Sequence, residues 1–95
     1  MNDELGHAQA HVTLLIKSST ERVAGFLLEM ADRSPKANEI DLPMSRQEIA
    51  DHLGLTIETV SRTLTKFDDA AVIGLPSFRH VTLLDRAALE RMSMS

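Results

Sequence analysis

The stretch SRQEIADHLGLTIETVSRTL, residues 45–64, constrains the fold of this chain more than any other feature. Ser45 followed by Glu48 forms a capping box, which predicts that a helix begins at Arg46. The apolar side of that helix consists of Ile49, Ala50 and Leu53. Gly54 follows at once, and a glycine there predicts a left-handed residue that ends the helix and turns the chain.

A second helix is predicted from Ile57 to about Asp68, with Thr56 as its N-cap and Leu55 as an apolar plug in the turn. Residues on opposite sides of this helix differ in character, at 100° per residue. Its core side carries Val60, Thr63, Leu64 and Phe67, and its outer side carries Glu58, Ser61, Arg62 and Thr65. One side fits a protein core, and the other has no core-forming residue.

Packing alone could produce such a pair, because short helix pairs with a glycine turn are common. Three details favour a helix-turn-helix motif that reads DNA. Ala50, Gly54 and Val60 have the spacing of two helices that cross steeply. The outer side mixes an acid, a base and hydroxyls, and a β-hairpin is predicted downstream. Such a motif offers its second helix to the major groove, where Glu and Arg distinguish base edges.

Similar periodicities place the other elements. Three further helices are predicted, over about 4–16, from the Ser18–Glu21 capping box to about Arg33, and from Arg86 to Met92 with Asp85 as its cap. Three strands are predicted, over Glu39 to Leu42, Val72 to Leu75 and His80 to Leu84. The last two strands are joined by a turn at 76–79. This order predicts a mainly α fold with a small antiparallel β-sheet (α+β), a winged helix-turn-helix.

The run RQEIADHLGLTIETVSRTL resembles the DNA-binding motif of the Crp/Fnr transcription regulators, and E-T-V-S-R at 58–62 is similar to its Fnr and FixK branch. Residues 19–33 resemble the helix that precedes the motif, and residues 72–92 resemble the wing and last helix. Full-length members also have a β-roll sensor and a long pairing helix. The resemblance implies a DNA-binding domain over 18–95 and a C-terminal stub of the dimerisation helix over 1–17.

The net charge of the chain and the apolar repeat near its N-terminus suggest how it binds DNA and a second copy of itself. Leu5, Ala8, Val12 and Leu15 recur at steps of three and four, so we expect a weak homodimer through residues 4–16. The net charge of −4 weighs against DNA binding, but seven of the 14 acids lie upstream of the motif, and within residues 43–66 three bases balance three acids. We therefore expect double-stranded DNA to be bound weakly by a monomer and mainly through two half-sites. RNA polymerase is a possible partner in the full-length context.

Other functions lack support in the sequence. The chain has no Cys, so disulfides, thiolate metal sites and iron–sulfur clusters are excluded within it. His7 and His11 have the i, i+4 spacing of zinc ligands but lack a third ligand, so neither a metal nor a cofactor is predicted. No phosphate loop or catalytic triad is evident, and we predict no enzyme. The apolar run 12–16 is too short for a signal or membrane segment, which suggests a cytoplasmic protein.

Four residues are the candidate base readers. Arg62 is expected to donate two hydrogen bonds to a guanine, and Glu58 to accept from a cytosine or adenine amino group while orienting Arg62. Ser61 can contact a thymine methyl or make one hydrogen bond. Ile57 stands where Crp has an Arg, which favours an Fnr/FixK kind of site. The resemblance implies a TTGA-type half-site in an inverted palindrome.

Six residues are candidate contacts to the DNA backbone: Ser45, Arg46, Thr56, Thr59, Lys66 and Arg79. The first four lie near predicted helix N-termini, which favour phosphate oxygens. For Ser45 and Thr56, helix capping alone is an equal alternative. For Lys66 and Arg79, a solvated charge is the alternative. A second function also stays open, in which the chain pairs with a full-length relative and inhibits it.

Overall fold

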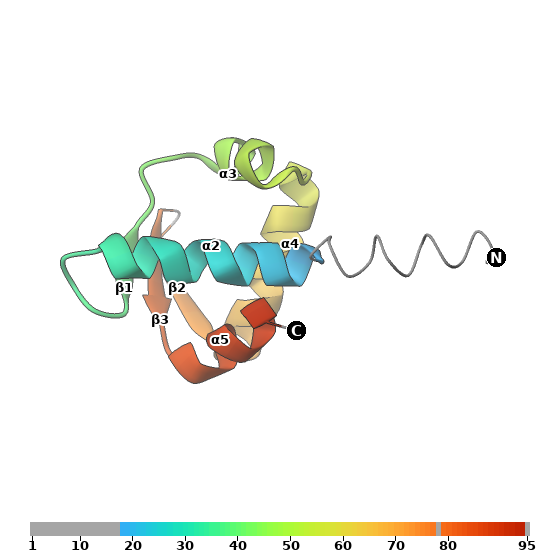
Figure 1. The fold of residues 1–95 in the computed structure, drawn as a ribbon. Helices are drawn as coiled ribbons and strands as arrows, with labels where there is room; N and C mark the ends of the chain where they lie inside the picture. Colours follow the sequence, from blue (N-terminus) through green and yellow to red (C-terminus); the bar gives the residue numbers. More distant parts are fainter. Residues whose placement is uncertain (1–17, 78, 95) are drawn as a thin grey trace.

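A computed structural model describes residues 18–77 and 79–94, which form four helices and a three-stranded antiparallel sheet (Figure 1). The helices are α2 (Ser19–Arg33), α3 (Arg46–Leu53), α4 (Ile57–Asp69) and α5 (Arg86–Met94), and the strands are β1 (Glu39–Asp41), β2 (Ile73–Ser77) and β3 (His80–Leu83). The predicted winged helix-turn-helix fold is thereby confirmed. The helix predicted over 4–16 lies outside the described residues. Within the described part, no helix is long and apolar enough to cross a membrane.

The helices begin where local capping signals predicted. The Ser18 hydroxyl accepts from the Glu21 amide at 3.2 Å, and the Glu21 carboxylate accepts from the Ser18 amide at 2.7 Å. Ser45 and Glu48 repeat this arrangement at 3.2 and 2.8 Å. Asp85 caps α5 by accepting from the backbone of Ala88 at 3.0 Å. Because each signal joins residues only three positions apart, the sequence sufficed to locate these helix starts.

The sheet has the order β1-β3-β2, so β3 is central and pairs with both neighbours. The predicted hairpin is confirmed, but its first strand is shifted. Pro76 and Ser77, predicted in the turn, belong to β2, while Val72 lies outside it. A register shift between Gly74 and Ser77 explains this, because a bulged edge strand accommodates a proline without losing a ladder hydrogen bond.

Two further strands end one residue earlier than predicted, and β3 ends at Leu83 rather than Leu84. The first strand ends at Asp41 rather than Leu42, although the Leu42 amide still donates to the Arg79 carbonyl at 2.7 Å. Its partner is β3, with Ile40 opposite Val81. The sequence did not indicate this pairing, because residues 40 and 81 are brought together only by the packing of the helices between them.

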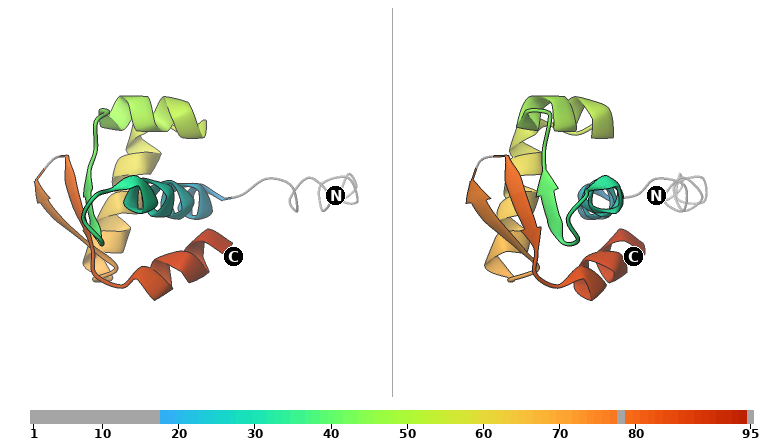
Figure 2. Two further views of the ribbon diagram at one scale, coloured as in Figure 1. Left: turned by 60° about the vertical axis from the view of Figure 1, so that its left-hand side comes forward. Right: turned by 90° about the vertical axis from the view of Figure 1, so that its left-hand side faces the viewer.

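A single core joins the helices and the sheet. The largest fully buried side chains are Phe67, Leu27, Ile40, Leu64, Ile73, Leu89, Val23, Val60 and Val81. α2 runs through the middle of the domain, with α3 and α5 on either side of it and α4 crossing it (Figure 2). Thr63 is the polar residue on the buried side of α4, and its hydroxyl donates to the Thr59 carbonyl at 2.8 Å. The predicted core side of α4 is confirmed, and its outer side is left to solvent.

The end of α4 contains a feature that the sequence did not suggest. The amide of Val72 donates to the Phe67 carbonyl at 2.9 Å, and that of Ala71 donates to the Asp68 carbonyl at 3.0 Å. This pair of bonds is a Schellman motif, which needs a left-handed residue after the helix. Ala71 takes that place with φ of 58°, where glycine is the usual residue.

Candidate nucleic-acid interface

The turn between α3 and α4 fixes the angle at which α4 leaves the domain. Gly54 has φ of 71°, which confirms its predicted left-handed conformation. The Leu55 amide donates back to the Ala50 carbonyl at 2.8 Å, so the turn closes on the last turn of α3. Ala50 is fully buried, and the Leu55 side chain packs partly against the core. The small residue, the glycine and the apolar plug each have the role that their spacing predicted.

Thr56 caps α4 and engages Thr59 at the same time. Its hydroxyl accepts from the Thr59 amide at 3.1 Å and donates to the Thr59 hydroxyl at 2.9 Å. The capping alternative is thus realised for Thr56, and also for Ser45 at the start of α3. A hydroxyl that accepts one bond can still donate its hydrogen, so the Ser45 cap remains compatible with a phosphate contact.

Three of the candidate base readers lie on the outer side of α4, and the fourth, Ile57, is its first residue. Glu58 and Arg62 are exposed, and Ser61 is half-buried. Ile57 leaves 37% of its surface accessible, which makes it one of the exposed large apolar residues of the described chain. No hydrogen bond or ion pair joins Glu58 to Arg62 within residues 18–77 and 79–94, so the expected orientation of Arg62 by Glu58 is not formed in this structure.

Arg62 and Lys66 stand between two surface hollows. One runs along the outer side of α4 and is lined by Ser61, Arg62, Thr65, Lys66, Asp69 and Ala70. The other lies between α4 and the first turn of α2 and is lined by Ser19, Thr20, Thr59, Arg62, Thr63 and Lys66. The second lining combines two cations with hydroxyl groups, a combination suited to phosphate oxygens. The α2 residues were missed from the sequence because only tertiary packing brings them beside α4.

Two further candidates for DNA backbone contacts, Arg46 and Arg79, are partly buried or bonded within the domain. Arg46 is half-buried, and this burial lowers the pKa of its guanidinium, which nevertheless stays protonated. Arg79 donates from Nη1 to the Pro43 carbonyl at 3.2 Å and so ties the wing turn to the segment before α3. Hydrogen bonds from Ser45 are the main cause of the lowered pKa of Glu48, and the charge of Arg79 lowers it further.

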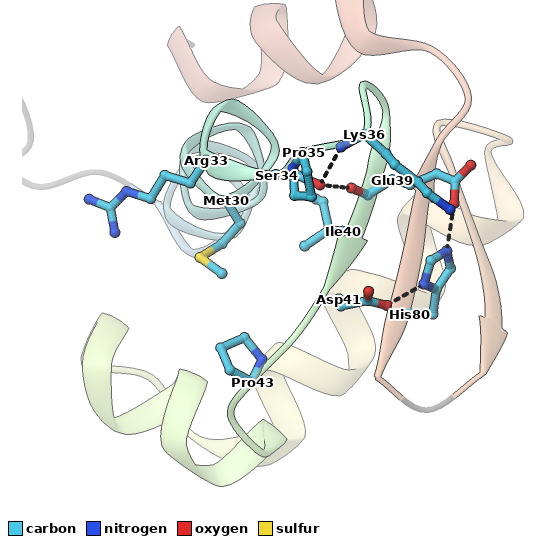
Figure 3. Close-up of a pocket in the computed structure, with 10 residues that line it drawn as sticks. All are labelled: Met30, Arg33, Ser34, Pro35, Lys36, Glu39, Ile40, Asp41, Pro43 and His80. Carbon is cyan, nitrogen blue, oxygen red and sulfur yellow. Dashed lines mark hydrogen bonds and ion pairs between the residues drawn. The ribbon is translucent and has the colours of Figure 1, made fainter.

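A separate hollow lies where α2 ends, against β1 and His80 (Figure 3). The His80 ring lies between two carboxylates, with Nδ1 at 2.6 Å from Asp41 and Nε2 at 3.4 Å from Glu39. Because the carboxylates face opposite ring nitrogens, the three groups do not converge on one ion. The described residues contain no group of three or more His, Cys, Asp or Glu placed to hold a metal. The His7 and His11 pair falls outside them.

The glycine-turned helix pair, the buried side of α4 and the antiparallel wing together define a winged helix-turn-helix domain. The model of the Crp-like helix-turn-helix domain matches residues 21–92. The chain therefore belongs to the family of Crp-like helix-turn-helix domains, as its sequence resemblance implied, and the relatives that it matches are transcription regulators.

Individual relatives give the same result. The chain is 55% identical to the nitrogen fixation regulation protein FixK of Azorhizobium caulinodans over 94% of its length, and 41% identical to the transcriptional activator FnrL of Cereibacter sphaeroides over 92%. The structure of FixK2 from Bradyrhizobium japonicum superposes with a TM-score of 0.80 at 43% identity and covers 99% of the chain. The chain spans 38% and 39% of the two sequence relatives and 48% of that solved chain.

Proposed function

We propose that this chain is the sequence-specific DNA-binding domain of a bacterial transcription regulator and reads a TTGA-type half-site through the major groove. The observation that carries the proposal is the outer side of α4, which presents an exposed Arg62 and Glu58 above a fully anchored core side. A rigid helix with an exposed polar side is what major-groove recognition requires. Such a function implies a cytoplasmic protein that acts without a catalytic site or cofactor.

The four readers divide the half-site between them. Arg62 donates two hydrogen bonds to O6 and N7 of the guanine, a geometry that the guanidinium fork fits. Glu58 accepts from the amino group of a cytosine or adenine. Ser61 approaches a thymine methyl or makes one hydrogen bond. Ile57, whose apolar surface is partly exposed at the start of α4, rests against another thymine methyl.

Backbone contacts orient α4 in the groove. Lys66 and the hydroxyl groups beside it are suited to contact the phosphates of one DNA strand. They line the same hollow as Arg62, so that these contacts would lie next to the base-reading side of α4. Ser45 and Arg46 lie at the start of α3, and Thr56 and Thr59 lie at the start of α4, where amide groups favour anions. Arg79 approaches phosphate from the wing when it exchanges its bond to the Pro43 carbonyl for one to DNA.

The half-site arrangement calls for two copies of the domain. An inverted palindrome mirrors a two-fold axis, and residues 4–16 carry the apolar repeat through which the copies would pair. In this proposal residues 1–17 are the stub of the dimerisation helix and residues 18–95 are the DNA-binding domain. In the full-length context, RNA polymerase would be a further partner.

A mobility-shift titration tests the proposal, with an inverted TTGA palindrome compared with a scrambled duplex of the same length and charge. We expect tighter binding to the palindrome, with a steep dependence on salt for both duplexes. Equal binding to the two would refute sequence-specific reading. Failure to bind either one, together with a stable heterodimer formed with a full-length relative, would instead support the inhibitory function.

A further inference from the structure

Arg22, in the first turn of α2, reaches across the domain to the helix-turn-helix. Its Nη1 donates to the carbonyl of Leu53 at 3.0 Å, although 31 residues separate the two in sequence. Leu53 is the last residue of α3, and its carbonyl is one of the C-terminal groups that have no acceptor role inside the helix. A partly buried, charge-assisted hydrogen bond therefore closes the end of α3.

The position of this cation is unfavourable for its own helix. A positive charge in the first turn of a helix opposes the helix dipole, whereas one at the C-terminal end of a helix is stabilised by it. The dipole of α2 thus disfavours the charge of Arg22, whereas the dipole of α3 favours it. Its guanidinium also lies against the turn itself, since a Cβ atom added to Gly54 would be 3.5 Å from Nη1.

A second contact joins the same two helices. The ring of Phe26, one turn after Arg22 on α2, lies 6.0 Å from the His52 ring, with 57° between the ring planes. Positions 22 and 26 of α2 therefore meet the adjacent residues 52 and 53, which end α3. The two contacts hold the last turn of α3 on α2 from one side, and the Gly54 turn follows directly.

We propose that Arg22 is a positioning residue for DNA recognition, which holds the end of α3 and the Gly54 turn so that α4 meets the bases at the correct angle. This inference rests on the proposed function. Arg22 acts through the turn, because its guanidinium is engaged with the Leu53 carbonyl. Its loss should therefore weaken binding to the correct site more than binding to arbitrary DNA.

Three variants of the full chain separate this role from a simple loss of charge. Arg22→Gln removes the guanidinium, and Arg22→Lys keeps the charge and a single donor nitrogen. Arg33→Gln is the matched control, because it removes the same charge from the other end of α2, where Arg33 pairs only with Glu29 among the described residues. Fluorescence anisotropy gives the affinity of each variant for the TTGA palindrome and for the scrambled duplex at one salt concentration.

We expect Arg22→Gln to lower the palindrome-to-scrambled affinity ratio roughly tenfold, the effect of one charge-assisted hydrogen bond. Arg33→Gln should leave that ratio unchanged and weaken both affinities equally. Arg22→Lys should recover most of the ratio. Hydrogen exchange of the Leu55 amide, which bonds to the Ala50 carbonyl, should accelerate in Arg22→Gln and stay constant in Arg33→Gln.

An equal ratio in Arg22→Gln and Arg33→Gln would overturn the role of Arg22 while leaving the proposed function intact. A wild-type protein that does not distinguish the two duplexes would overturn the proposed function, and the recognition role of Arg22 with it. If Arg22→Gln is too unstable to assay, both variants are made in a Gly25→Ala background, since a Cβ at that position meets no atom of the described residues within 4 Å.

Discussion

Replacing Gly54 by alanine tests the conformation on which the presentation of α4 depends. At φ of 71°, the left-handed conformation of an alanine lowers the free energy of unfolding by ~1–2 kcal/mol. The smaller conformational entropy of alanine in the unfolded chain raises it by ~0.4–1 kcal/mol. The added Cβ would lie 3.5 Å from Arg22 Nη1, an ordinary contact, so no clash contributes. The free energy of unfolding should therefore fall by about 1 kcal/mol, which is a few degrees in Tm for a domain of this size.

Gly25→Ala is the matched control, because the same chemical change occurs inside α2. No described residue has an atom within 4 Å of the added Cβ, and an interior helical glycine costs ~0.5–1 kcal/mol relative to alanine. This variant should gain about as much stability as Gly54→Ala loses. Urea unfolding followed by far-ultraviolet circular dichroism measures both, with equal m-values expected. Changes of the same sign in the two variants would refute the reasoning.

Three further substitutions have outcomes fixed by particular contacts. Ala71→Gly relieves a left-handed alanine after α4 and should raise the free energy of unfolding by ~1 kcal/mol, seen as a higher Tm; no change would show that the site is not strained. Leu64→Ala empties a position that is 2% exposed and should cost ~2–5 kcal/mol in urea unfolding; a loss well below that range would mean that the core repacks. Ser45→Ala removes the hydroxyl that bonds to Glu48 but keeps the backbone amide of residue 45, whose hydrogen bond to the carboxylate at 2.8 Å is the larger cause of the lowered pKa of Glu48. An NMR titration should therefore show that pKa rising only part of the way toward its ordinary value, and an unchanged pKa would contradict a contribution from the hydroxyl. Because the pKa of Glu48 is lowered in the folded state, its stabilisation is complete above the unfolded pKa of about 4.3 and is lost as pH falls through the folded pKa; the stability difference between wild type and Ser45→Ala should therefore shrink in acid.

Features that depend on neighbouring residues could be predicted from the sequence. The Ser18 and Ser45 capping boxes, the left-handed Gly54 and the buried side of α4 all follow from residues within one or two turns of each other. The same is true of the outer side of α4, since a helix with one buried side must present the other. For this reason the fold class and the candidate base-reading residues could be proposed from the sequence.

Features that depend on residues far apart in the sequence could not be predicted from it. The pairing of β1 with β3, the Arg22 bond to the Leu53 carbonyl and the Arg79 bond to the Pro43 carbonyl each join segments more than 30 residues apart. No local pattern specifies such partners. Pro76 was assigned to a turn because proline usually interrupts strands, and only the edge position and bulge of β2 make it acceptable.

The most direct test of the account measures which base Arg62 reads. Wild type and Arg62→Ala are titrated against the TTGA palindrome and against duplexes that carry each single-base replacement in both half-sites. Wild type should lose ~1–3 kcal/mol of binding when the guanine is replaced, and Arg62→Ala should lose that discrimination at the guanine alone. Lys66→Ala, the backbone control, should weaken binding to all duplexes equally. An Arg62→Ala variant with the affinity and base preferences of the wild type would contradict the account.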